Sequence, residues 1–72
     1  MYKIRYIKAS EITDVKYVFE TRDIDVETDE AAIAELKAEA AQPLEGSLSM
    51  DVVRGENYTW EILDTVELQL HN

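Results

Sequence analysis

The sequence has no cysteine, a single histidine, one proline and only two glycines. Without cysteine, no disulfide can stabilise the fold and no thiolate can act as a nucleophile or bind zinc. The only histidine, His71, is the last residue but one, so we expect no Ser–His catalytic pair. Two glycines are too few for a glycine-rich phosphate loop. We therefore predict a protein that is not an enzyme and binds no cofactor.

Long apolar runs are also missing. No stretch approaches the ~20 apolar residues that a membrane-spanning helix needs. Residues 1–8 alternate between apolar and basic side chains and lack the apolar segment of a signal peptide. We expect a cytoplasmic protein with no membrane partner.

Positive charge is scarce, with seven Lys and Arg against sixteen Asp and Glu, for a net charge of −9 over 72 residues. The charge is unevenly spread: residues 1–22 carry +2, residues 23–39 carry −6 and residues 40–72 carry −5. The acidic parts would repel phosphates, so we expect no direct nucleic-acid binding and favour a basic partner. The length predicts a single domain over 1–72 with a small core.

The sequence predicts one helix, over residues 29–42. Thr28 is suited to cap its first turn, and the acids that follow it are favoured at the positive end of the helix dipole. Pro43 disfavours helical geometry in the preceding residue, so the helix should stop there. The expected buried stripe is Ile33, Leu36 and Ala40, with Glu35 and Glu39 pointing the other way.

Alternating apolar and polar residues predict strands over 2–8, 15–22, 47–54 and 58–70. The last segment is either one strand with a bulge near Asp64 or two short strands, and the lack of Gly or Pro favours one strand. We expect a turn over 54–57, where Gly55 and Asn57 tolerate positive φ. The order β-β-α-β-β predicts an α+β fold, a four-stranded antiparallel sheet with one helix packed on one face.

One helix leaves the second face of such a sheet open. The parity of the strands predicts a mixed-charge open face, with Lys3, Arg5, Lys16 and Arg22 beside Asp51, Glu61 and Glu67. The predicted core is Ile4, Tyr6, Tyr17, Phe19, Ile33, Leu36, Leu48, Met50, Val52, Trp60, Ile62 and Leu68.

Acids at alternate positions from Asp23 to Asp29 resemble the start of a calcium-binding EF-hand loop. That loop needs Gly at its sixth position and Glu at its twelfth, where this chain has Thr28 and Ala34. The pattern fails at both positions, and we predict no metal site.

The acidic block supports two interpretations. It is either a solvated, solubilising surface or a row of charges that occupies a groove of Lys and Arg built for phosphates. Residues two apart on a strand lie about 6.6–6.8 Å apart on one side, which suits the second interpretation. The candidate partner-binding residues are Asp23, Asp25, Glu27, Asp29, Glu30, Glu35 and Glu39.

In size, charge and element order, and in the run Asp-Ile-Asp-Val-Glu-Thr-Asp-Glu over 23–30, the chain resembles small acidic phage-encoded inhibitors of the anti-CRISPR and DNA-mimic type. The resemblance carries over no individual residue. It implies a non-catalytic inhibitor, acting in the host cytoplasm, that docks on a basic nucleic-acid-binding site of a host protein complex. The net positive charge of residues 1–22 departs from a uniformly acidic mimic and suggests one acidic face.

The alternative is a small structural or self-assembling protein. The strand predicted over 58–70 could lie at a sheet edge and pair with a second copy, giving a homodimer with a merely solubilising acidic surface.

Overall fold

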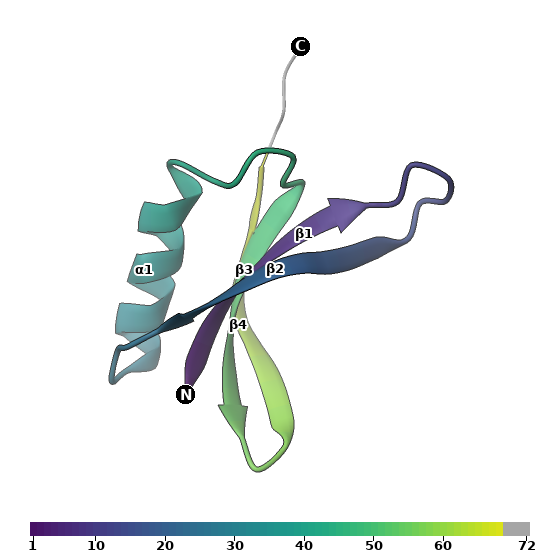
Figure 1. Cartoon of the computed structure of the whole chain (residues 1–72). Helices are drawn as coiled ribbons and strands as arrows, with labels where there is room; N and C mark the ends of the chain where they lie inside the picture. Colours follow the sequence, from purple (N-terminus) through teal and green to yellow (C-terminus); the bar gives the residue numbers. More distant parts are fainter. Residues whose placement is uncertain (69–72) are drawn as a thin grey trace.

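The structure is a computed structural model of the whole chain, and residues 1–68 are described. The elements are β1 (Tyr2–Ala9), β2 (Lys16–Ile24), α1 (Asp29–Ala40), β3 (Ser49–Glu56) and β4 (Thr59–Glu67). The strands form one antiparallel sheet in the order β2-β1-β3-β4, with α1 on one side (Figure 1). The predicted element order, sheet and single helix are confirmed.

The helix begins where the sequence predicts and ends earlier. The side chain of Thr28 accepts a hydrogen bond of 3.1 Å from the backbone N–H of Ala31. The helix stops at Ala40, two residues earlier than predicted and three before Pro43. Ala32 and Leu36 are fully buried, whereas Ile33 and Ala40 are only partly buried.

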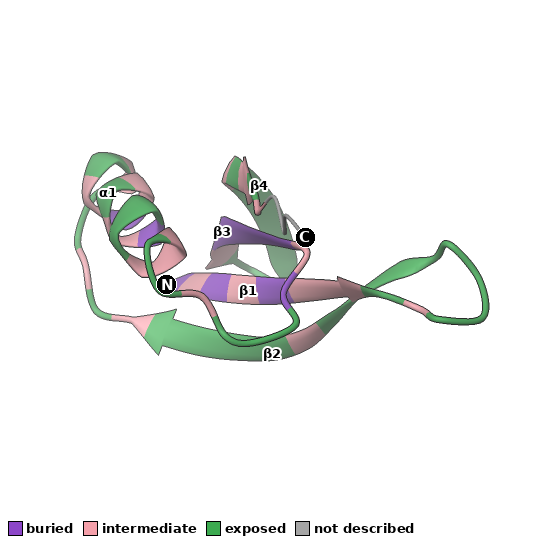
Figure 2. Cartoon of the chain, turned by 90° about the horizontal axis from the view of Figure 1, so that it is seen from above, coloured by how far each residue is buried: buried purple, intermediate pink, exposed green. Residues whose placement is uncertain are grey.

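The core lies between α1 and the two central strands, which show the most buried residues in Figure 2. Alternate residues of β1 point toward the helix, and the matching residues of β3 lie beside them. The buried core cluster is Tyr2, Ile4, Tyr6, Ala32, Leu36, Met50 and Val52. Leu36 provides most of the fully buried apolar side chain that the helix contributes to the core, since the other buried helical residue is an alanine.

Each edge strand contains one extra residue. Phe19 is the extra residue of β2, where the pairing passes from Tyr6↔Glu20 to Ile7↔Val18. Leu63 is the extra residue of β4, where it passes from Val52↔Asp64 to Val53↔Ile62. Because side chains alternate along a strand, each bulge moves the residues beyond it to the opposite face. The preference for one bulged strand at the C-terminal end is confirmed up to Glu67; its predicted continuation to Leu70 lies outside the described residues.

These bulges overturn part of the predicted core. Trp60 and Ile62 lie on the open face and are 47% and 55% exposed. Tyr17 is 48% exposed, because the β1–β2 hairpin runs on past the last β1–β3 pair, Ile7↔Ser49. Phe19 and Leu68, by contrast, are partly buried against the core as predicted.

The same bulges correct two predicted charge positions. Arg22 is paired with Ile4 and Glu61 with Arg54, so both lie on the helix side of the sheet rather than on the open face. Lys3, Arg5, Lys16, Asp51 and Glu67 keep the predicted side.

The β3–β4 turn lies further along the chain than predicted. Asn57 and Tyr58 have φ of 53° and 71°, the conformation of a two-residue hairpin turn. Gly55 lies within β3, where it pairs with Trp60, and a Cβ atom on it would lie 2.4 Å from the Trp60 ring. This glycine therefore makes room for an aromatic ring rather than for a turn.

Within residues 1–68, no helix is both long enough and apolar enough to cross a membrane.

Candidate partner-binding site

Three of the seven candidate acids are bound by side chains of the sheet. The guanidinium of Arg22, on β2, forms ion pairs with Glu35 at 3.3 Å and with Glu39. The Tyr6 hydroxyl also donates to Glu39, at 3.1 Å. The predicted outward direction of these two helical glutamates is therefore wrong, because Arg22 faces them across the helix side of the sheet. The pKa of Tyr6 is raised, first by burial and then by this hydrogen bond.

Asp29 is the third bound acid. The Tyr2 hydroxyl donates to its Oδ1 at 2.8 Å, and the Arg54 guanidinium donates to its Oδ2. The Tyr2 hydrogen bond, followed by Arg54, lowers the pKa of Asp29, and the same hydrogen bond raises the pKa of Tyr2. These contacts hold the start of α1 against β1 and β3, so the carboxylate of Asp29 stabilises the fold.

Asp23 has a weaker partner. Its carboxylate lies 3.7 Å from the Lys3 ammonium and its side chain is 73% exposed, so solvent screens most of this attraction.

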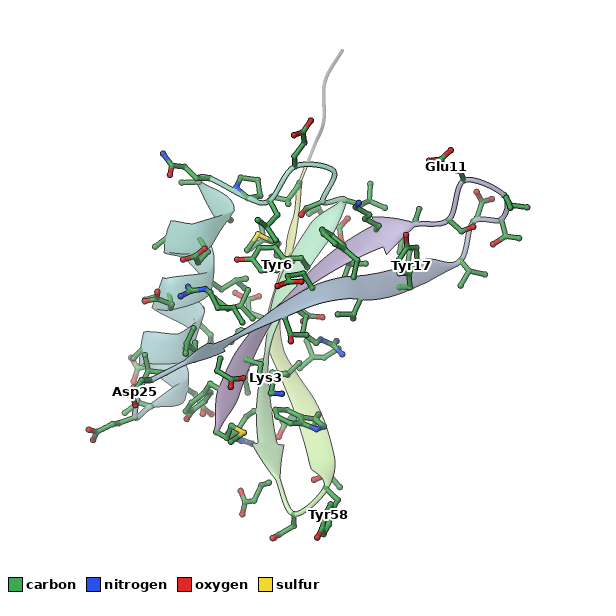
Figure 3. The ribbon with its side chains drawn as sticks, in the orientation of Figure 1. Lys3, Tyr6, Glu11, Tyr17, Asp25 and Tyr58 are labelled. Carbon is green, nitrogen blue, oxygen red and sulfur yellow. The ribbon has the colours of Figure 1, made fainter. Side chains whose placement is uncertain are left out.

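The three remaining candidates form what we call the acidic corner: Asp25, Glu27 and Glu30, at the turn from β2 into α1. All three are exposed, and within residues 1–68 none has a cationic group within 4.0 Å. Asp25 lies at the end of the molecule opposite to Glu11 (Figure 3). The structure thus reduces seven candidate acids to three whose charge is uncompensated.

The open face of the sheet is a second candidate surface. The sequence predicts its mixed charge but not the exposed apolar residues on it. At its centre the carboxylate of Asp51, 3% exposed, accepts two hydrogen bonds of 2.7 Å from Nε and Nη2 of Arg5. This bidentate pair raises the pKa of Arg5. Ser49 and Val53 beside it are 3% and 1% exposed, although no helix covers this side.

Apolar side chains flank this pair. Val18, Trp60 and Ile62 are 39%, 47% and 55% exposed. The Lys3 ammonium lies 5.2 Å from the centre of the Trp60 ring. Two adjacent surface hollows of about 300 and 340 Å³ share Arg5 and Val18 and extend across all four strands. Exposed apolar side chains that gather on one uncovered face of a sheet are candidates for an interaction surface.

Within residues 1–68, no three His, Cys, Asp or Glu side chains are grouped so that they could hold a metal ion. His71 lies outside this range. No protein-family model, curated protein sequence or solved structure matches the chain.

Proposed function

We propose that this chain is a non-catalytic binding protein that uses its acidic corner to occupy a basic, nucleic-acid-binding site on a partner protein. The supporting observation is that the charges of Asp25, Glu27 and Glu30 are exposed and have no internal cation, while Asp29, Glu35 and Glu39 are held by the fold.

The positions of the three acids suit a protein that competes with phosphate groups for a basic binding site. Asp25 and Glu27 are two residues apart in the connection between β2 and α1, and Glu30 follows in the first turn of the helix. Carboxylates in this arrangement offer a partner's Lys and Arg several acceptors over a short distance, and long-range attraction accelerates the encounter. Blocking would be steric as well as electrostatic, because the corner joins β2 to α1 and docking would bring both elements to the partner's site.

The test has two steps. The tagged chain is used to capture proteins from a lysate of the source cells at low salt. Each nucleic-acid-binding protein recovered is then bound to a labelled nucleic acid, and the purified chain is titrated in. We expect displacement of the nucleic acid, weakening as salt rises because both interactions are ionic.

The decisive variant carries Asp25→Lys, Glu27→Lys and Glu30→Lys. Its matched control carries Glu11→Lys, Asp14→Lys and Glu45→Lys, three exposed acids outside the corner that have no ion pair within residues 1–68. Both variants change the net charge equally. The corner variant should lose displacement and the control should keep most of it, with circular dichroism showing that both are folded. Equal loss in both variants, or no displacement by the natural chain, would overturn the proposal.

A further inference from the structure

We infer that the open face of the sheet binds a second copy of this chain, so that two sheets pack face to face with the helices outside. This inference concerns a different surface from the acidic corner and does not depend on the function proposed above.

The first observation is charge balance. The chain as a whole carries −9, so two copies repel each other over most approaches. The ionisable residues on the open face, by contrast, are three cations and three anions, with no net charge: Lys3, Arg5, Lys16, Asp23, Asp51 and Glu67. Approach through this face adds no local charge repulsion, although the rest of each chain still carries −9.

The second observation is the pattern of those charges. β1 and β3 are the central strands and β2 and β4 the edges. A two-fold axis running along the strands, between β1 and β3, places β2 of one copy over β4 of its partner and β1 over β3. Arg5 then faces the second copy's Asp51. An axis perpendicular to the strands that passes through this pair would instead place Arg5 over Arg5. Because Arg5 is 28% exposed and Asp51 only 3%, repulsion between the two guanidinium groups favours the first arrangement.

The same axis brings together two charges that have no ion pair within residues 1–68. Lys16 pairs with Ala9 at one end of β2, and Glu67 pairs with Ser49 at the same end of β4. When β2 lies over the second copy's β4, the long side chain of Lys16 can reach Glu67 of the other molecule. Two-fold symmetry forms this contact twice.

Size and shape agree with this occupant. The strands lie one behind another in the view of Figure 1 and are seen spread from β2 to β4 in Figure 2. Four strands of eight or nine residues give a face of about 19 × 27 Å, roughly 500 Å² in projection, which suits a weak, concentration-dependent dimer. Twisted sheets with aligned strands pack well face to face, about 10 Å apart. The exposed surfaces of Val18, Trp60 and Ile62 would be covered in this contact, with Val18 at the level of the second copy's Glu67 and Ile62 at the level of its Asp23.

Edge-to-edge pairing, the route suggested by the long C-terminal strand, fits less well. β4 is indeed an edge strand, but both edge strands contain a bulge and exposed charged side chains. These are the devices with which natural proteins prevent edge pairing.

The experiment is sedimentation velocity of the full chain between about 1 and 100 µM, in moderate salt so that overall repulsion is screened. We expect a monomer–dimer equilibrium. Val18→Glu and Ile62→Glu alter exposed side chains of the open face and should raise the dimer Kd at least tenfold. Ile12→Glu and Leu44→Glu, matched changes at exposed apolar residues outside the sheet, should leave the Kd within about twofold. Circular dichroism confirms that each variant is folded.

A charge exchange tests the orientation. Lys16→Glu alone and Glu67→Lys alone should each weaken the dimer, and the double variant should recover it, because the contact is only reversed. A chain that stays monomeric at 100 µM overturns the inference, as does a dimer that tolerates Val18→Glu and Ile62→Glu.

Discussion

The ion pair between Arg5 and Asp51 should be the most strongly coupled charge pair in the sheet. Each of its two hydrogen bonds is 2.7 Å long, and the carboxylate is almost fully buried. The guanidinium is 28% exposed, so it regains part of its hydration when its partner is removed. Breaking a fully buried pair costs 3–5 kcal/mol and an exposed pair 0–1 kcal/mol, so we expect about 2 kcal/mol for Asp51→Ala.

Arg5→Ala should cost more, about 3 kcal/mol, because it leaves the less exposed of the two charges without its partner. The double variant Arg5→Met, Asp51→Leu replaces both charges with apolar side chains and should cost less than either single change. Unfolding by urea, followed by tryptophan fluorescence, measures all three. Two protein concentrations separate this effect from any contribution of self-association.

A double-mutant cycle isolates the interaction itself. We expect a coupling energy of about 2 kcal/mol between Arg5 and Asp51. The pair Lys3 and Asp23 lies on the same face at 3.7 Å but is largely exposed, and its cycle should give less than about 0.5 kcal/mol. A coupling below about 0.5 kcal/mol for Arg5 and Asp51 would show that water reaches the centre of the open face, and the reasoning from burial would be wrong.

Three further predictions concern single residues. Tyr2 and Arg54 lower the pKa of Asp29. Ionised Asp29 therefore stabilises the fold above its unfolded pKa of about 3.9, and this stabilisation is lost as the pH falls through the lower folded pKa. The difference in urea midpoint between the natural chain and Asp29→Asn should be largest near pH 7 and shrink below pH ~4. Tyr58 is fully exposed at φ 71°, so Tyr58→Gly should stabilise by about 1 kcal/mol, and a loss of stability would contradict the assigned turn. The Ser47 hydroxyl is buried and finds no hydrogen-bond partner among the described residues, so Ser47→Ala should be neutral or stabilise by up to about 1 kcal/mol; a cost above 1 kcal/mol would reveal a hidden partner.

The sequence predicts the elements well because their causes are local. Thr28 forms the N-cap, Pro43 follows the end of the helix, and the strands show the alternation that half-buried strands require. The face of the sheet to which each side chain points is less predictable, because one inserted residue reverses it for the residues beyond. The sequence predicts the bulge near Asp64, one residue after its position at Leu63. A strict alternation still assigns Trp60 and Ile62 to the core, whereas the bulge turns both to the open face. The bulge at Phe19 has no Gly or Pro to signal it.

Assigning a strand residue to the wrong face of the sheet also changes the prediction of the candidate site. If Phe19 is treated as an ordinary strand residue, Arg22 is predicted on the open face. No cation is then expected near Glu35 and Glu39. The extra residue turns Arg22 toward α1, where it neutralises both. Ion pairs between residues 13 and 17 positions apart depend on which face a strand presents, so a local pattern cannot supply them.

The spatial distribution of charge separates the two interpretations of the acidity. The four strands together carry −1 and the helix −3, while the connecting segments carry the remaining −5. About half of the charged residues in the strands form ion pairs, among them Arg5 with Asp51 and Arg22 with Glu35 and Glu39. Among the acids of the connecting segments, which form no ion pair within residues 1–68, Glu11 lies at the tip of one hairpin and Asp25 at the opposite end of the molecule (Figure 3). A solubilising role predicts that both groups are equivalent, because only net charge matters. A docking role predicts that they differ, because a basic groove contacts one end only. The two charge-matched triple variants measure that difference directly.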